Sequence, residues 1–101
     1  MYVESRPSTP ERQAEYNNWY DEVHLAEVCA IDGVVSARRF VPVDGEGPFV
    51  AIYELEADDL GSVMEQLGKK AASGELHMTD AMQLDPMPKI SILEQTSELS
   101  S

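Results

Sequence analysis

Residues 33–57, GVVSARRFVPVDGEGPFVAIYELEA, decide the fold of this 101-residue chain. Apolar residues recur with the period of a β-strand over 33–43 and again over 49–57, which predicts two strands. The five residues 44–48 contain two glycines and a proline, so they predict a turn that closes an antiparallel hairpin. In the first strand, odd-numbered residues are expected on one face and even-numbered residues on the other. In the second, Phe49, Ala51, Tyr53 and Leu55 are expected to share a face.

A helix is expected on each side of this hairpin. Thr9 and Pro10 have the features of an N-cap and a first helical position, and apolar residues then recur every three or four positions. This helix is predicted to cover residues 10–30 and to end at Gly33, which can adopt a left-handed conformation. The second helix is predicted to start within 57–59, with an aspartate as N-cap, and to end near Gly74.

The outer segments complete the order of elements. Residues 1–5 and 89–95 predict two short strands, residues 75–85 show no clear pattern, and the polar tail 96–101 is expected to fray. The order βαββαβ predicts an α+β fold of the ferredoxin-like type, with a four-stranded antiparallel sheet and two helices on one face. We expect a single domain over residues 1–101. Because both faces of the hairpin carry apolar residues, the face without helices is expected to bind a second copy, giving a homodimer.

Composition excludes several classes of partner. Asp and Glu number 19 against 7 Lys and Arg, a net charge of -12, which disfavours binding to nucleic acid or to an anionic membrane surface. No apolar run approaches the roughly 20 residues of a membrane span. The first seven residues do not resemble a signal peptide, and the single Cys29 suits a reducing compartment, so we expect a cytoplasmic protein.

The densest group of chemically capable residues lies on the first helix. Tyr20 and His24 are four residues apart and share a helix face, which Tyr16 extends as a stripe of aromatic residues with polar tips. Asp21 and Glu27 each lie three residues from His24. Either carboxylate is expected to accept a ring N–H, orient the imidazole and raise its pKa, or else to be a solvated surface group. His24 itself is either a proton carrier or a hydrogen-bonded structural histidine.

At this helix the sequence resembles a known family. Trp19-Tyr20-Asp21-Glu22-Val23-His24-Leu25 resembles the Trp-Tyr-Asp-x-x-His-hydrophobic helix of EthD-like dimeric α/β-barrel proteins, and residues 32–40 and 51–55 resemble their second and third strands. The resemblance implies a dimeric α/β barrel with a ligand cavity between sheet and helices. Members of this superfamily include cofactor-free monooxygenases, polyketide cyclases, muconolactone isomerases, haem-degrading enzymes and proteins of unknown role. Two departures are a short first strand and Ala26, where many relatives carry proline.

Two consecutive arginines stand in the middle of the predicted strand 33–43. Arg38 and Arg39 must point to opposite sides of the sheet, so one of them is expected near a covered surface, where it needs an anionic partner. That partner is either Glu54 or Glu56 on the neighbouring strand, or the carboxylate or enolate of a ligand.

These residues predict a site for proton transfer. The expected catalytic residues are His24 as base or acid, Asp21 orienting it and Tyr20 stabilising an enolate oxygen. Arg39 can also stabilise that oxygen. The expected ligand-binding residues are Tyr16, Trp19, Glu27, Arg39, Tyr53 and Met64. For Trp19 and Tyr53, plain packing in the core or at an interface is the alternative.

The expected ligand is an apolar, aromatic or polyketide-like acid or carbonyl compound, converted without a cofactor by an isomerase, a cyclase or a cofactor-free monooxygenase. His24 and His77 do not have a metal-binding spacing, so no metal is expected. The fold would admit haem, but the sequence shows no convincing axial ligand. The alternative function is a non-catalytic accessory or scaffolding dimer in a catabolic or biosynthetic pathway.

Overall fold

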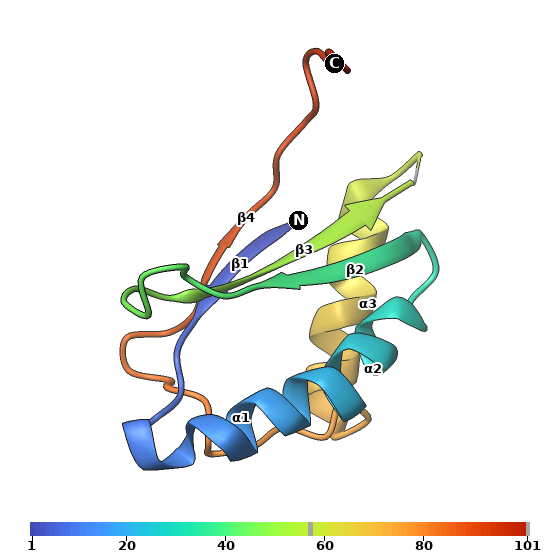
Figure 1. The fold of residues 1–101 in the computed structure, drawn as a ribbon. Coiled ribbons are helices and arrows are strands. Elements are labelled where there is room, and N and C mark those ends of the chain that lie inside the picture. The colour runs from blue at the N-terminus through green and yellow to red at the C-terminus, as the bar shows by residue number, and fades with distance from the viewer. Residues whose placement is uncertain (57, 101) are drawn as a thin grey trace.

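The structure is a computed structural model that describes residues 1–56 and 58–100. Figure 1 shows the order of the elements along the chain. They are β1 (Tyr2–Ser5), a 3-10 turn η1 (Pro10–Arg12), α1 (Gln13–Trp19), a π-helical turn η2 (Tyr20–His24), α2 (Leu25–Cys29), β2 (Val34–Phe40), β3 (Phe49–Leu55), α3 (Leu60–Ser73) and β4 (Lys89–Ser91).

The four strands form one sheet in the order β2-β3-β1-β4, and each neighbouring pair is antiparallel. The predicted α+β class with a four-stranded antiparallel sheet is therefore confirmed. All four strands are shorter than predicted: β1 and β3 lack Met1 and Glu56, and β2 and β4 lose several residues. β2 ends at Phe40, two residues before Pro42, which has no N–H for a ladder. β4 ends at Ser91, which lies opposite Tyr2, the first residue of its antiparallel neighbour β1. The last residue of the predicted strand 49–57 lies outside the described residues.

A β-bulge changes which residues of β2 face the helices. Val34 pairs with Leu55 but Ser36 pairs with Glu54, so one extra residue is accommodated at Val35. Val34 is therefore buried beside Ala37, while Val35 is 51% exposed. The predicted alternation, which placed Val35 with Ala37 and Val34 on the opposite face, is wrong for these two residues. The predicted faces of β3 are correct.

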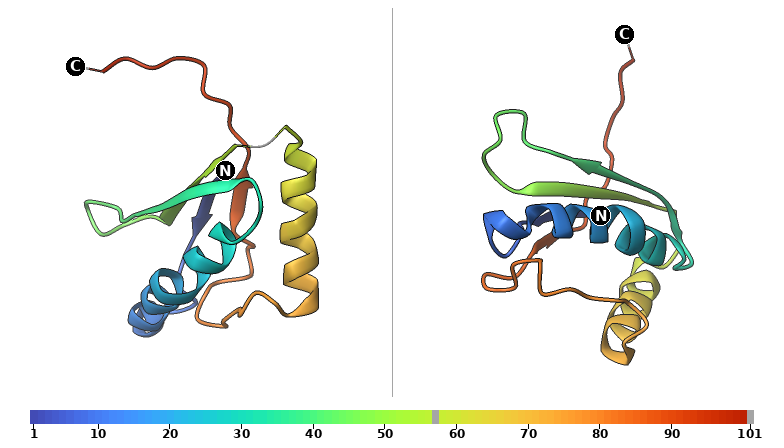
Figure 2. Two further views of the ribbon diagram at one scale, coloured as in Figure 1. Left: turned by 90° about the vertical axis from the view of Figure 1, so that its right-hand side faces the viewer. Right: turned by 60° about the horizontal axis from the view of Figure 1, so that its bottom comes forward.

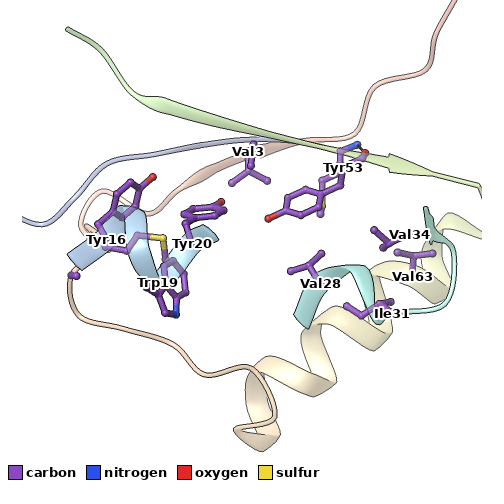
Figure 3. Close-up of a cluster of buried hydrophobic side chains, with 13 residues drawn as sticks. Val3, Tyr16, Trp19, Tyr20, Val28, Ile31, Val34, Tyr53 and Val63 are labelled. Atoms are coloured by element: carbon purple, nitrogen blue, oxygen red, sulfur yellow. Dashed lines mark hydrogen bonds between the residues drawn. The ribbon is translucent and has the colours of Figure 1, made fainter. Parts of the chain in front are cut away.

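The helices lie against one face of the sheet. In Figure 2, α1 and α2 run beneath the strands, while the opposite face of the sheet carries no helix among the described residues. Helix α3 stands at one end of this layer, where Val63 lies close to Ile31 and Val34 (Figure 3). None of the helices in residues 1–56 and 58–100 combines the length and apolar character needed to cross a membrane.

The first helical segment has the predicted extent but contains an irregular turn. The N–H of Leu25 bonds to the carbonyl of Tyr20, five residues back, instead of four. The buried residues before this turn are Tyr16, Trp19 and Tyr20, and the main ones after it are Val28 and Ile31. At about 100° per residue, an uninterrupted α-helix would rotate the second group about 100° away from the first. The extra residue of the π turn removes this offset, so both groups face the core.

Helix α3 follows the local rules for helix ends. The Asp59 side chain accepts a hydrogen bond from the Ser62 N–H, and Gly74 ends the helix with a positive φ of 82°. Gly33, with a φ of 99°, closes the first helical segment in the same conformation. Both predicted glycine ends are thus confirmed. Val63 is the one fully buried residue of α3.

Residues 75–88 form an ordered loop that passes across the first helical segment on the side away from the sheet (Figure 1). Leu76, Ala81 and Met82 are buried in it. Its backbone is tied to the segment after β1, because the Ser8 N–H donates to Ala81 and the Gln83 N–H donates to Arg6. The first helical segment therefore lies between the sheet on one side and this loop on the other.

Candidate functional site

The π turn brings the aromatic residues of the first helical segment into contact with His24. The Tyr20 ring meets the imidazole edge-on at 5.0 Å, and the Trp19 indole stacks on it at 4.5 Å with 23° between the planes. Residues five apart on an α-helix point about 140° apart, so the Trp19–His24 stack exists only because the turn is widened. Single π turns of this kind are frequent at functional sites.

His24 is half-buried, and its Nδ1 atom is buried without a hydrogen-bond partner. Burial lowers the pKa of His24 to about 4, and nearby Glu27 opposes this shift only weakly. The imidazole is therefore neutral at pH 7. Glu27 does act to raise this pKa, as expected, but burial outweighs it, and neither of the two candidate carboxylates bonds to the ring.

Asp21 binds Arg39 instead of His24. The Arg39 Nη1 donates to the Asp21 carboxylate at 2.9 Å, and its Nη2 donates to Asn17 Oδ1 at 2.9 Å. Its guanidinium lies 4.5 Å from the centre of the Tyr20 ring. Arg39 is thus the arginine that faces the helices, and its Nε is buried without a partner. The expected role of Asp21 as the residue that orients His24 is not what this structure shows.

Arg39 does not pair with a glutamate of the neighbouring strand, which was one of the two expected kinds of partner. Glu54 lies on the outer side of the sheet, where its carboxylate accepts a hydrogen bond from Ser36 Oγ at 3.1 Å. A helix residue replaces it as the partner because the guanidinium reaches across the layer between sheet and helix. The expected position of Arg39 among the site residues is therefore supported by geometry, with Asp21 as its anion.

Glu27 binds the loop after α3. Its carboxylate accepts one hydrogen bond from the His77 N–H at 2.9 Å and lies 2.7 Å from His77 Nδ1. Partial burial acts to raise the pKa of Glu27, but the hydrogen bonds from His77 outweigh it and hold the pKa below its ordinary value. Trp19 joins the same contact, since its Nε1 donates to the His77 carbonyl at 2.5 Å.

Three tyrosines fill the space between the first helical segment and the sheet. Tyr16, Tyr20 and Tyr53 are almost completely buried, and the hydroxyls of Tyr20 and Tyr53 both point into this space (Figure 3). Tyr16 exchanges a hydrogen bond with Ser5 Oγ at 2.5 Å, whereas the Tyr53 hydroxyl is buried without a partner. Burial raises the pKa of all three phenols, with neighbouring Tyr20 adding to the effect on Tyr53, so they are neutral donors.

The remaining predicted site residue, Met64, lies on α3, partly buried against the core. The structure therefore gathers Tyr16, Trp19, Tyr20, His24 and Arg39 around one another by direct contacts. It places Asp21 and Glu27 at the rim of this group, each bound to a different partner.

Two open grooves at the surface lie elsewhere. The larger, of about 940 Å³, runs over the outer face of the sheet between Tyr2, Arg38 and Ile52 and the segment 92–95. The smaller, of about 300 Å³, lies between the end of β1 and the loop 83–88. His24 lines neither groove. In this structure the interior of the candidate site is closed by its own aromatic side chains.

Reasoning from the sequence missed three residues that shape this site: Ser5, Asn17 and His77. All three act through contacts distant in the chain, for which local spacing gives no signal. Among residues 1–56 and 58–100, no group of three or more His, Cys, Asp or Glu side chains is placed to hold a metal ion. Comparison with known proteins gives no match, whether to a family model, a curated protein or a solved structure.

Proposed function

We propose that the protein binds an apolar acid or carbonyl compound between the first helical segment and the sheet and transfers a proton from it to His24. One observation carries the proposal. Three polar atoms around Tyr20 are buried without partners: His24 Nδ1, Arg39 Nε and the Tyr53 hydroxyl. Each such atom costs roughly 1–3 kcal/mol of folding free energy. Structures rarely retain this cost unless the groups have a role, such as receiving a polar ligand.

The three groups supply complementary chemistry. A neutral imidazole can accept the proton from a carbon next to a carbonyl, and the electron pair of the broken C–H bond then moves to the carbonyl oxygen. That oxygen becomes an enolate, which Arg39 or a tyrosine hydroxyl can stabilise. A histidine with a pKa of about 4 holds a proton poorly, but an anionic ligand beside the ring raises that pKa. No cofactor is needed for this step.

The apolar character of the proposed ligand follows from the aromatic side chains that line the space between the first helical segment and the sheet. Tyr16, Tyr20, Trp19 and Tyr53 offer aromatic faces, and aromatic or planar molecules pack well against such faces. Isomerisation, cyclisation and cofactor-free oxygenation all begin with removal of this proton, so the proposal names the step that they share.

The experiment measures this step directly. The protein is incubated in D₂O with phenylpyruvate or acetylacetone, and deuterium incorporation next to the carbonyl is followed by NMR. The wild-type protein is expected to accelerate incorporation. His24→Ala should reduce the acceleration by about a hundred-fold or more, as expected for loss of a general base.

Glu65→Gln provides the matched control, because Glu65 is an exposed residue of α3 that contacts Lys69 at the surface. It should exchange deuterium at the wild-type rate. Full acceleration in folded His24→Ala would show that His24 is not the base. No acceleration by the wild-type protein with either compound would contradict the proposal and favour the second candidate.

That second candidate is a non-catalytic accessory or scaffolding dimer. It is favoured by the closed packing of Tyr16, Tyr20 and Tyr53, and by the absence of His24 from both surface grooves. In this case His24→Ala should change only the free energy of unfolding.

For both candidates we propose a homodimer of ferredoxin-like, EthD-like subunits in the cytoplasm. The strand order β2-β3-β1-β4 supports the fold assignment. The outer sheet face supports association with a second copy, because Phe40 and Ile52 are 47% and 41% exposed on it. Arg38 and Glu54 lie on the same face, so a two-fold axis can bring opposite charges together.

Sedimentation equilibrium tests the dimer. The wild-type protein is expected at twice the chain mass, and Ile52→Glu at the monomer mass because it places a charge in the interface. Leu99→Glu, in the exposed tail, is the control and should remain dimeric. A wild-type monomer at micromolar concentration would rule out this interface.

A further inference from the structure

We propose that residues 77–80 form a removable cover over Trp19 and His24, held shut by Glu27, and that a ligand reaches His24 when this cover lifts. The inference rests on the proposed function for its purpose, but the cover can be tested without a ligand. We refer to residues 77–80 as the strap.

The residues that flank the strap are buried, whereas the strap itself is mostly exposed. Leu76 on one side and Ala81 on the other are buried, and Ala81 is held by the backbone hydrogen bond from Ser8. Between them, His77, Met78 and Asp80 are exposed. A short segment that buries little apolar surface between two anchored ends opens at a low free-energy cost compared with global unfolding.

Glu27 supplies the main connection between the strap and the helix. Its two carboxylate oxygens contact the backbone N–H and the ring Nδ1 of His77, at 2.9 and 2.7 Å. The other polar links are the hydrogen bond from Trp19 Nε1 to the His77 carbonyl and the Arg12–Asp80 ion pair at 2.7 Å, in which the Asp80 side chain is 87% exposed. A surface ion pair of this kind contributes little. Loss of Glu27 should therefore remove two of the three polar contacts of His77 and leave the strap easier to lift.

Beneath the strap lies the only tryptophan of the chain. Figure 3 shows the Trp19 indole directed away from β3, toward the loop that follows α3. Its Nε1 donates to the His77 carbonyl, and its other side stacks on the His24 imidazole. The indole thus contacts both the strap and the imidazole. Lifting the strap removes the acceptor of Trp19 and so frees the indole to move off the imidazole.

This route would open the face of the half-buried imidazole on which the indole stacks. On the sheet side, His24 is covered by Tyr20, and the two surface grooves do not lead to it. Glu27 and His77 act as positioning residues, because they hold Trp19 against the imidazole without touching the reacting atoms.

Acrylamide quenching of the Trp19 fluorescence at pH 7, without ligand, tests the strap. Glu27→Ala removes both contacts to His77 and favours the helix, so the fold should be kept. Its quenching constant is expected to rise at least about twofold over that of the wild type, because local opening exposes the indole. His77→Ala keeps the backbone N–H contact and should give a smaller rise. Glu65→Ala, an exposed glutamate of α3, is the control and should quench like the wild type.

Equal quenching in Glu27→Ala and the wild type, with unchanged circular dichroism, would overturn the proposal. An equal rise in Glu65→Ala would do the same, since it would show general loosening. The outcome is separable from that of the proton-transfer test. If quenching rises in Glu27→Ala but His24→Ala keeps full deuterium exchange, the strap is supported and His24 is not the base. If quenching is unchanged in Glu27→Ala but His24→Ala loses exchange, His24 is supported as the base and the strap is not a cover.

Discussion

The two helical regions of this molecule are built in opposite ways. Helix α3 is regular, has an aspartate cap at one end and a glycine at the other, and fully buries only Val63. The segment from η1 to α2 changes helix type three times, and its Thr9 cap makes no side-chain hydrogen bond. Yet this segment buries Tyr16, Trp19 and Tyr20 together with the unpaired Nδ1 atom of His24.

The difference separates a helix set by local signals from one held by tertiary contacts. Helix α3 is specified mainly by local signals, so its sequence alone nearly determines it. The first segment is held by tertiary contacts to the sheet and to the loop 75–88, which keep an irregular turn and unpaired polar atoms in place. Irregular geometry that the surroundings must support is typical of sites that bind or react.

The largest expected effect tests the difference in packing. Tyr20→Ala should lower the free energy of unfolding by about 3–5 kcal/mol, because it removes a buried aromatic ring that contacts Trp19, His24 and Arg39. Val63→Ala in α3 should cost about 2 kcal/mol, from the loss of two methyl groups. Urea denaturation measures both values. Similar losses for the two variants would break the comparison.

The next effect concerns pH. The folded-state pKa of His24, about 4, lies below the unfolded value of 6.5, so the unfolded chain takes up a proton first as the pH falls. The contribution of His24 is therefore fully present above pH 6.5 and is lost between pH 6.5 and 4. The loss should reach about 3 kcal/mol, since each pKa unit corresponds to about 1.4 kcal/mol.

His24→Phe isolates this contribution. Phenylalanine fills the space of the imidazole and can stack on Trp19, but it does not titrate. Urea denaturation at a series of pH values should show a steeper loss of stability on acidification for the wild type than for the variant. Parallel curves would mean that His24 is solvated in the folded protein.

A smaller effect compares the ion pairs of the two regions. Asp21→Asn removes the negative charge beside Arg39, whose side chain is only 13% exposed, and should cost about 2 kcal/mol. Glu65→Gln on α3 breaks a pair in which both side chains are mostly exposed, and should cost less than about 0.5 kcal/mol. Thermal denaturation of the two variants gives the ratio. A larger loss for Glu65→Gln would contradict the assignment of Arg39 to the covered side of the sheet.

The smallest effect concerns the helix caps. Asp59→Ala should lower the free energy of unfolding by about 1 kcal/mol, because it removes the acceptor for the Ser62 N–H. Thr9→Ala should change it less, since the Thr9 side chain makes no capping hydrogen bond. Urea denaturation of both variants checks the order, and an equal loss would show that Thr9 does cap the first helical segment in solution.

Much of the fold could be predicted because its signals are local. The alternation over 49–55 placed the faces of β3 correctly, and Gly33 and Gly74 marked two helix ends. The faces at the start of β2 were predicted wrongly because the bulge at Val35 shifts the alternation by one residue. The loop 75–88 gave no periodic signal, since it is held by Leu76, Ala81 and Met82 and by contacts to residues 6–8.

The sequence predicted which residues lie in the candidate site, but not which of their side chains bind one another. Spacing along a helix places Tyr20 and His24 together, and the structure confirms that contact. Spacing also suggested that Asp21 and Glu27 serve His24. They bind Arg39 and His77, 18 and 50 residues away in the chain. The fold brings these donors within hydrogen-bond distance of the two carboxylates, and helix spacing alone cannot predict this. One feature of the sequence could have indicated the π turn. On a regular α-helix the apolar residues up to Tyr20 and those from Val28 onward would point about 100° apart around the helix axis, which one extra residue corrects.

The π turn also limits how this chain can vary by mutation. A point substitution changes a side chain but leaves the number of residues between Tyr20 and Val28 unchanged, so it cannot restore a regular helix without turning Val28 and Ile31 away from the core. A deletion of one codon within residues 21–24 can. Homologues with and without the stacked imidazole would therefore differ in the length of this helix, and an alignment without gaps would pair residues that are not equivalent.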